Sequence, residues 1–274
     1  MTKCAAVQMA SSPDVRANIN EAERLISDAA KMGSKLIVLP ENFALMGKTE
    51  FDKLDHKESD DGGPIQDFLA NISKQYSIWL VAGTVPMTAS SNNKIRAACL
   101  VYNDKGKRIA RYDKIHLFDV NVPGTEEQYQ ESETIEAGEN ALVLDTPFGR
   151  IGVAVCYDLR FPELFRQMID EGMEILVLPS AFTAKTGAAH WDLLVRTRAV
   201  ENLCYVIASN QGGFHLNGRE TYGHSMIVDP WGKVVSEITS GSGIASGEVD
   251  CELLRKIRVS FPALHHRRLV CGLN

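Results

Sequence analysis

Short apolar runs without polar alternation recur along the chain. Runs of this kind are typical of parallel strands that are covered on both faces. They predict strands at 3–8, 36–39, 78–82, 151–155 and 203–208. Between the strands, apolar residues at helical spacing predict helices at 18–31, 64–76, 162–172 and 188–202. The alternation of strands and helices indicates an α/β fold.

Two stretches of the chain resemble copies of one helix-and-strand unit. Residues 25–40 (LISDAAKMGSKLIVLP) align without a gap with residues 164–179 (LFRQMIDEGMEILVLP). Each half also contains a predicted hairpin whose turn ends in Gly-Lys, at 100–112 and 226–238. We therefore expect two similar α/β halves in a single domain that spans residues 1–274, with two sheets packed face to face and helices outside.

Two long segments lack a periodic apolar pattern. Residues 44–64 are polar and rich in turn residues, and we expect little regular structure there. Residues 118–138 form a long acidic segment, and long loops in compact domains are often functional. Its glutamates are Glu126, Glu127, Glu131, Glu133 and Glu136. For most of them, simple solvation is the favoured interpretation.

The charge balance and the cysteines restrict the functional class. The 274 residues include 29 basic and 35 acidic side chains, which give a net charge of -6 without a basic stripe. We expect neither nucleic acid nor a membrane surface as a partner, and a small molecule as the substrate. The chain shows no secretory leader and no long apolar run, which favours the cytoplasm. The six cysteines are far apart, so free thiols are expected rather than disulfides.

One of these cysteines, Cys156, follows the predicted strand 151–155 and precedes a helix that begins at Pro162. A helix N-terminus favours the thiolate, which is the nucleophilic form of cysteine. Taken alone, Cys156 would be interpreted as a small buried core residue, which is the more frequent role of a cysteine. Other residues at strand ends decide between the two interpretations.

Two charged residues follow predicted strands in a similar way. Glu41 comes directly after the strand 36–39, and Lys114 follows a hairpin strand. The ends of strands are where α/β sheets place groups that handle ligands. Each alone would be interpreted as an ordinary surface charge. The histidines do not stand out as a base for the cysteine, and no spacing typical of a metal site is present.

At these three positions the chain resembles the nitrilase-like carbon-nitrogen hydrolases. The matching motifs are LPENF around Glu41, YDKIHLF around Lys114 and GVAVCYDLRFPEL around Cys156. The resemblance spans nearly the whole chain and is greatest to the amidase branch that contains omega-amidase and deaminated-glutathione amidase. It implies a four-layer α-β-β-α sandwich, a Glu-Lys-Cys catalytic set, no cofactor and oligomers built from dimers. It also implies a supporting role for Glu131, which we expect to orient Lys114 or the substrate.

The chemistry expected of this set follows from proton affinities. Moving a proton from a free thiol to a free carboxylate is uphill by about 4 pKa units on reference values. We expect burial to raise the pKa of Glu41, and the Lys114 ammonium together with the helix N-terminus to lower the pKa of Cys156. Lys114 and the backbone N–H of Tyr157 would form an oxyanion hole. A thioester would then be hydrolysed by water that Glu41 activates.

Substrate specificity depends on residues around this set. Arg160 would either cap a local turn or point its guanidinium into the pocket, where it would pair with a substrate carboxylate. Of Arg196 and Arg198, at most one is expected to reach the site. The candidate pocket walls, whose alternative role is core packing, are Phe43, Tyr157, Phe182 and Trp191.

We therefore expect an amidase that acts on a small carboxylate-bearing amide. The alternatives are a nitrilase or carbamoylase with the same residues, and a scaffold protein without turnover. From Cys251 onward, we expect a short helix followed by an extended segment. This tail, residues 251–274, is expected to pack at a two-fold dimer interface, because 261–273 is too extended to fold on its own.

Overall fold

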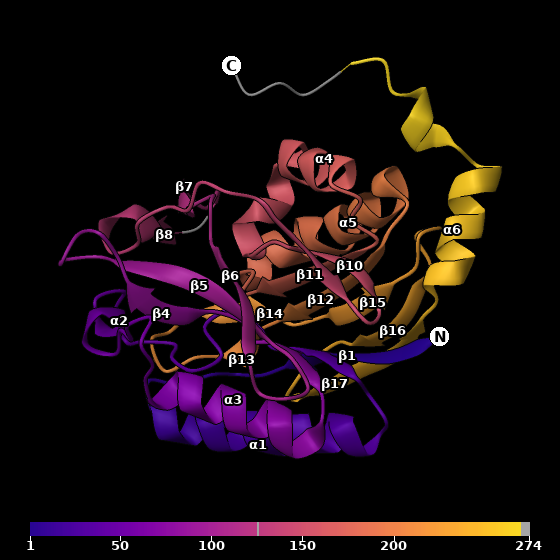
Figure 1. The fold of residues 1–274 in the computed structure, drawn as a ribbon. Coiled ribbons are helices and arrows are strands. Elements are labelled where there is room, and N and C mark those ends of the chain that lie inside the picture. Colours follow the sequence, from indigo (N-terminus) through magenta and orange to yellow (C-terminus); the bar gives the residue numbers. More distant parts are fainter. Residues whose placement is uncertain (125, 270–274) are drawn as a thin grey trace.

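The computed structural model describes residues 1–124 and 126–269, and places two sheets face to face between two layers of helices (Figure 1). The first sheet has the strand order β17-β1-β2-β3-β5-β4, with β6 paired to β5. Its strands are β1 (Thr2–Gln8), β2 (Leu36–Val38), β3 (Trp79–Val81), β4 (Val85–Thr88), β5 (Ile95–Tyr102), β6 (Arg108–Asp113) and β17 (Gly243–Val249).

The second sheet has the order β16-β15-β12-β11-β10-β9. Its strands are β9 (Leu142–Thr146), β10 (Gly149–Val153), β11 (Ile175–Ser180), β12 (Tyr205–Asn210), β15 (Ser225–Val228) and β16 (Val234–Ile238). Two small hairpins lie outside both sheets, and they pair β7 (Asp119–Asn121) with β8 (Gln128–Gln130) and β13 (Gly212–Phe214) with β14 (Glu220–Tyr222).

Helices cover the outer face of each sheet (Figure 1). The helices α1 (Val15–Lys31) and α3 (Pro64–Tyr76) lie against the first sheet, and α4 (Pro162–Asp170) and α5 (Ala184–Asn202) lie on the side of the second. Local sequence sets their first turns: Asp14 accepts a hydrogen bond from the N–H of Ala17, and Thr183 accepts one from the N–H of Thr186. The helices α2 (Asp52–Asp55) and α6 (Cys251–Ser260) are short additions.

Strand β2 and the residue after it show why the apolar runs lack alternation. Leu36 and Val38 point into the core between the two sheets, whereas Ile37 and Leu39 point into the core beneath α1 and α3. All four side chains are fully buried, and burial of each contributes about 1.5–3 kcal/mol. The four-layer α-β-β-α architecture is thereby confirmed.

The internal repeat is visible in the backbone. Strand β1 is parallel to β2, and β10 is parallel to β11. Gly33 and Gly172, which occupy matching places before β2 and β11, have φ angles of 92° and 86°. A side chain at either position would be strained in this left-handed conformation, which explains glycine in both copies. The two halves of the fold are similar, as the sequence predicts.

Several local expectations need correction. The segment 44–64 contains α2, and 118–138 contains the β7–β8 hairpin followed by a 3-10 turn at Glu131–Glu133. Helix α4 begins at Pro162 as predicted, but Cys156 belongs to a separate 3-10 turn, Cys156–Arg160, that the sequence analysis did not anticipate. The helix after residue 251 is confirmed as α6, but a third 3-10 turn, Ala263–His266, follows it. Residues 270–273 of the predicted extended tail lie outside the described residues.

Across the described ranges, no helix combines the length and apolar character needed to cross a membrane.

Candidate active site

Glu41 lies just beyond the end of β2, on a backbone that both halves of the fold hold in place. The N–H of Asn42 donates to Thr84 Oγ1 at 2.8 Å, and Asn42 adopts a φ of 57°. From the second half, Gln211 Nε2 donates to the carbonyl oxygen of Glu41 at 2.9 Å. Glu41 itself is only 3% exposed. These contacts fix the carboxylate at the sheet edge where the sequence predicts it.

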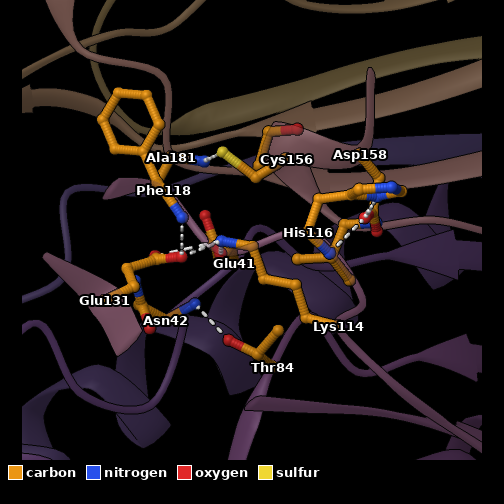
Figure 2. Close-up of polar contacts among 12 residues, drawn as sticks. Glu41, Asn42, Thr84, Lys114, His116, Phe118, Glu131, Cys156, Asp158 and Ala181 are labelled. Atoms are coloured by element: carbon orange, nitrogen blue, oxygen red, sulfur yellow. Dashed lines mark hydrogen bonds and ion pairs between the residues drawn. The ribbon is translucent and has the colours of Figure 1, made fainter. Parts of the chain in front are cut away.

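The ammonium of Lys114 bridges two carboxylates (Figure 2). Its Nζ lies 2.7 Å from Glu41 Oε1 and 2.7 Å from Glu131 Oε2. The Lys114 side chain is fully buried. Glu131 Oε2 also accepts the N–H of Phe118 at 2.8 Å, which anchors the acidic segment to the ion pairs. The structure therefore brings Glu41, Lys114 and Glu131 together.

Cys156 begins the 3-10 turn after β10 and has a φ of 49°. A positive φ at a non-glycine residue costs about 1–3 kcal/mol and persists only where the surroundings impose it. The N–H of Ala181, which follows β11, donates to Cys156 Sγ at 3.5 Å (Figure 2). Cys156 lines the same cavity as Glu41 and Glu131.

Asp158 holds this turn, and sequence reasoning did not identify it. Its fully buried carboxylate accepts the N–H of Val155 at 2.8 Å, the hydroxyl of Tyr112 at 2.7 Å and the N–H of His116 at 3.1 Å. His116 Nδ1 also lies 2.7 Å from Asp158 Oδ1. The carboxylate thus connects the β6 end, which precedes Lys114, with the turn that carries Cys156. Asp158 and His116 lie far apart in the chain, so no local sequence pattern gives a signal of their contact.

The electrostatics of the site correct two expectations, the raised pKa of Glu41 and the lowered pKa of Cys156. Burial alone would raise the pKa of Glu41, but the charge and hydrogen bond of Lys114 hold it below its ordinary value. Burial alone would lower the pKa of Lys114, but Glu131 and Glu41 raise it well above its usual range. Burial and the charge of Glu41 raise the pKa of Cys156 well above its ordinary value, and Lys114 offsets this only in part.

The resting site therefore contains a neutral thiol, a carboxylate at Glu41 and an ammonium at Lys114. The expectation that the site lowers the pKa of Cys156 is wrong. The two carboxylates already outnumber the single ammonium in contact with them, so a thiolate would add a second uncompensated negative charge.

A neutral thiol predicts slow alkylation of Cys156 at neutral pH. Because only the thiolate reacts, the rate with iodoacetamide should rise about tenfold per pH unit between pH 6 and pH 9, without a plateau. Mass spectrometry of the Cys156 peptide measures this rate, with a small thiol of ordinary pKa as the reference. A rate that is already constant below pH 7 would show a resting thiolate instead.

The cavity at Cys156 has a volume of about 10 Å³, which admits about one water molecule. A substrate must therefore displace some of the side chains around it. Of the residues expected to form its walls, Tyr157, Arg160 and Phe182 line the cavity.

The expectation that Phe43 and Trp191 form pocket walls is wrong. Phe43 is buried in the core beneath α1 and α3, and Trp191 packs edge-on behind Phe182 at a centroid distance of 4.9 Å. Neither Arg196 nor Arg198 reaches the cavity. Arg196 donates to the carbonyl oxygen of Gly232, and Arg198 to that of Leu159.

The structure adds cavity residues that sequence reasoning missed, and these are Phe118, Ala181, Thr183, Thr186 and Arg219. Ala181 could have been predicted from the sequence, because the internal repeat aligns it with Asn42, next to the end of a strand. Arg219 has no such signal, since long-range packing of the β13–β14 hairpin brings it to the site.

Comparison with known proteins places this geometry in a family. Residues 3–259 match the family model described as carbon-nitrogen hydrolase. The chain belongs to the carbon-nitrogen hydrolase family. It is therefore an enzyme that hydrolyses carbon–nitrogen bonds other than peptide bonds.

Several relatives of this carbon-nitrogen hydrolase carry amidase names. It is 40% identical over 269 residues to the deaminated glutathione amidase of Synechocystis sp., covering 97% of this chain and 98% of that protein. It is 37% identical over 267 residues to an omega-amidase of Xenopus laevis, covering 97% and 95%. Among solved structures, the C. elegans NitFhit protein superposes with a TM-score of 0.89 at 35% identity, covering 97% of this chain and 65% of that longer one.

Proposed function

We propose that this hydrolase is a cysteine-dependent amidase that cleaves a small carboxylate-bearing amide through a thioester, with deaminated glutathione as the favoured substrate. The observation that carries the proposal is the buried Lys114 ammonium, paired with Glu41 and Glu131 beside the cavity that Cys156 lines. The amidase names of the relatives support the substrate class.

In the acylation step, Cys156 Sγ attacks the amide carbonyl carbon while Glu41 accepts the thiol proton. Because the proton leaves as the C–S bond forms, a free thiolate is never required, which agrees with the raised pKa of Cys156. The oxyanion accepts hydrogen bonds from Lys114 Nζ and the N–H of Tyr157. An ammonium has three N–H donors, and in the described structure they face Glu41 Oε1 and both oxygens of Glu131, so one Glu131 contact would be exchanged for the oxyanion.

Glu41 then delivers its proton to the amide nitrogen as the C–N bond breaks, and the amine departs. In the second half of the reaction, Glu41 takes a proton from water, which attacks the thioester and releases the carboxylic acid. The proton returns to Sγ. Glu131 orients Lys114, because both of its oxygens lie within 3.0 Å of Nζ.

Arg160 is the proposed partner of a carboxylate on the acyl part of the substrate. Its guanidinium lines the cavity, within 5.9 Å of the Tyr157 ring centroid and 5.5 Å of that of Phe182. Its Nη1 lies 3.2 Å from His190 Nδ1, and no carboxylate in the described ranges forms an ion pair with it. A substrate carboxylate would fill this role, and Tyr157 and Phe182 would contact the acyl chain.

A ranking of substrates tests the proposed function. The expected order of kcat/KM is deaminated glutathione, then α-ketoglutaramate, then a neutral short amide and a nitrile. A neutral substrate leaves the guanidinium of Arg160 without its partner, which should lower kcat/KM by about 10- to 100-fold. The Arg160→Ala variant should lose most of this discrimination. A neutral amide or a nitrile as the best substrate would overturn the proposal.

Alternatives within the family use the same residues. An omega-amidase would prefer α-ketoglutaramate, and a nitrilase or carbamoylase would prefer a nitrile or an N-carbamoyl group. Adding an N-carbamoyl amino acid to the same assay, with ammonia release as the readout, separates them. No metal or cofactor enters the proposed steps.

Oligomeric state and location complete the proposal. We expect a two-fold dimer in which the C-terminal segment takes part, because Trp231, Val259 and Phe261 are 63%, 81% and 51% exposed. Sedimentation velocity at micromolar concentration measures this state.

Free thiols support a cytoplasmic location, because the cytoplasm keeps cysteines reduced. The free thiols in the described residues are Cys4, Cys99, Cys156, Cys204 and Cys251, and Cys271 lies outside them.

A further inference from the structure

A buried histidine holds the turn end of the β13–β14 hairpin against the first half of the fold. Phe214 and Leu216 are 79% and 77% exposed, whereas His215 between them is buried. Because the large apolar side chains face solvent, the position of this turn depends mainly on polar contacts. Asn217 Nδ2 supplies one of them, to the carbonyl oxygen of Gly47 at 2.9 Å, and the ring of His215 supplies others.

Each nitrogen of the His215 ring has a partner. Nδ1 lies 2.8 Å from the carbonyl oxygen of Ser11, and Nε2 lies 2.8 Å from Thr221 Oγ1. A carbonyl oxygen can only accept, so Nδ1 carries the proton and Nε2 accepts from the hydroxyl. Burial and the charge of Arg219 lower the pKa of His215, which favours this neutral form. The imidazole therefore joins Ser11, in the first half of the fold, to the hairpin in the second.

Ser11 in turn supports the backbone of Glu41. The N–H of Ser11 donates to Gln211 Oε1 at 3.0 Å, and Ser11 Oγ accepts from Gln211 Nε2 at 2.8 Å. The same Nε2 donates to the carbonyl oxygen of Glu41 at 2.9 Å, and Ser11 Oγ donates to that of Phe43 at 2.9 Å. Ser11 and Gln211 are buried, so a bond that is lost here leaves an unpaired buried group. A shift of the Ser11 peptide would therefore move Glu41, the proton acceptor of the proposed reaction.

The same hairpin also reaches the nucleophile. The N–H of His215 donates to the carbonyl oxygen of Arg219 at 2.9 Å, which closes the turn that carries this arginine. Arg219 Nη2 donates to the carbonyl oxygen of Ala181, and the N–H of Ala181 donates to Cys156 Sγ (Figure 2). His215 therefore lies between two chains of hydrogen bonds, one that ends at Glu41 and one that ends at Cys156.

We propose that His215 is a positioning residue for amide hydrolysis, and that its Nδ1–H bond to Ser11 sets the position of Glu41 relative to Cys156. The inference rests on the proposed function, in which Glu41 accepts the proton of Cys156 as the C–S bond forms. A small displacement of either group slows this transfer, because donor and acceptor must be in hydrogen-bond contact. His215 is not among the described residues that line the cavity at Cys156, so its effect should appear in kcat rather than in KM.

Two amide substitutions separate the roles of the two ring nitrogens. Asparagine places an amide nitrogen near the position of Nδ1, and glutamine places one near the position of Nε2. His215→Asn should keep the bond to Ser11 and a kcat within about threefold of the native value. His215→Gln and His215→Leu should lose this bond and lower kcat by about 10- to 100-fold, with KM nearly unchanged. Steady-state hydrolysis of deaminated glutathione measures both constants.

Arg160 provides an independent readout. Its proposed preference for a substrate carboxylate is measured as the ratio of kcat/KM for deaminated glutathione to that for a neutral short amide. This ratio should be unchanged in all three His215 variants, because the hydrogen bonds of His215 do not involve Arg160. Phe214→Ser is the matched control on the same hairpin, since its side chain is exposed, and it should leave kcat and KM unchanged.

Thermal unfolding identifies the variants that fold, and the comparison of His215→Asn with His215→Gln tests the inference even if His215→Leu does not fold. Equal losses of kcat in these two variants, a native kcat in His215→Gln, or a change confined to KM or to the Arg160 ratio would overturn the inference alone. If the native enzyme hydrolysed no carboxylate-bearing amide, the proposed function and this inference would both fail.

Discussion

The Cys156→Ala variant is expected to lose turnover by a factor on the order of 10⁴ or more. In the proposed mechanism Sγ forms the covalent bond to the substrate, and the described cavity offers no second thiol to replace it. Glu41→Gln should have nearly the same effect, because a carboxamide cannot accept the thiol proton. The measurement is steady-state hydrolysis of deaminated glutathione, followed as amine release.

The fold of the Cys156→Ala variant should persist, because alanine keeps the Cβ and removes only Sγ, to which the N–H of Ala181 donates at 3.5 Å. Cys251→Ala serves as a control, since Cys251 is a free thiol far from the cavity lining. It should retain full activity. Residual turnover of Cys156→Ala above about one tenth of the native rate would exclude the thioester route.

The second large effect is expected from Lys114→Met. Methionine has a similar length but leaves the buried carboxylates of Glu41 and Glu131 without the cation that contacts both. Removal of one partner from a buried ion pair costs about 3–5 kcal/mol, so both stability and activity should fall. Urea unfolding at pH 7 measures the loss of stability.

The pH dependence separates this cause from a packing defect. Without Lys114, burial should raise the folded-state pKa values of the carboxylates above their unfolded values, so protonation favours the folded variant. The stability difference from the native enzyme should therefore shrink as the pH falls from 7 to 5. Lys31→Met, at an exposed lysine of α1, should change stability little at either pH. An equal loss for Lys114→Met at both pH values would indicate a cavity or overpacking effect instead.

Local patterns explain what could be predicted about the fold. The strand predicted at 36–39 is observed at Leu36–Val38, and the helix predicted at 64–76 is observed at Pro64–Tyr76. Both segments carry an unbroken pattern ended by a glycine or proline boundary. The β7–β8 hairpin was missed because its strands are three residues long and mostly exposed, so they leave no apolar pattern to detect.

The candidate site also contains some residues that could be predicted from the sequence and others that could not. Glu41 and Cys156 could be located because each follows a buried strand and lies in a motif that resembles the family's, whereas Arg219 and Asp158 act through contacts with residues far away in the chain. The pKa shifts of Cys156 and Glu41 were predicted in the wrong direction because each depends on a balance of burial against several charges. That balance depends on the distances between charged groups in the folded structure, and the spacing of residues along the chain does not reveal these distances.

Glu41 and Cys156 come from opposite sheets, so the geometry of the site depends on how the two halves of the fold pack together. Gln211, in the second half, holds the backbone of Glu41, in the first. Neither half could therefore keep a working arrangement if the sheets slid or separated by even a small amount. Catalysis should therefore be lost when the two sheets separate during denaturation. Enzyme activity then reports on the cooperative assembly of the two halves.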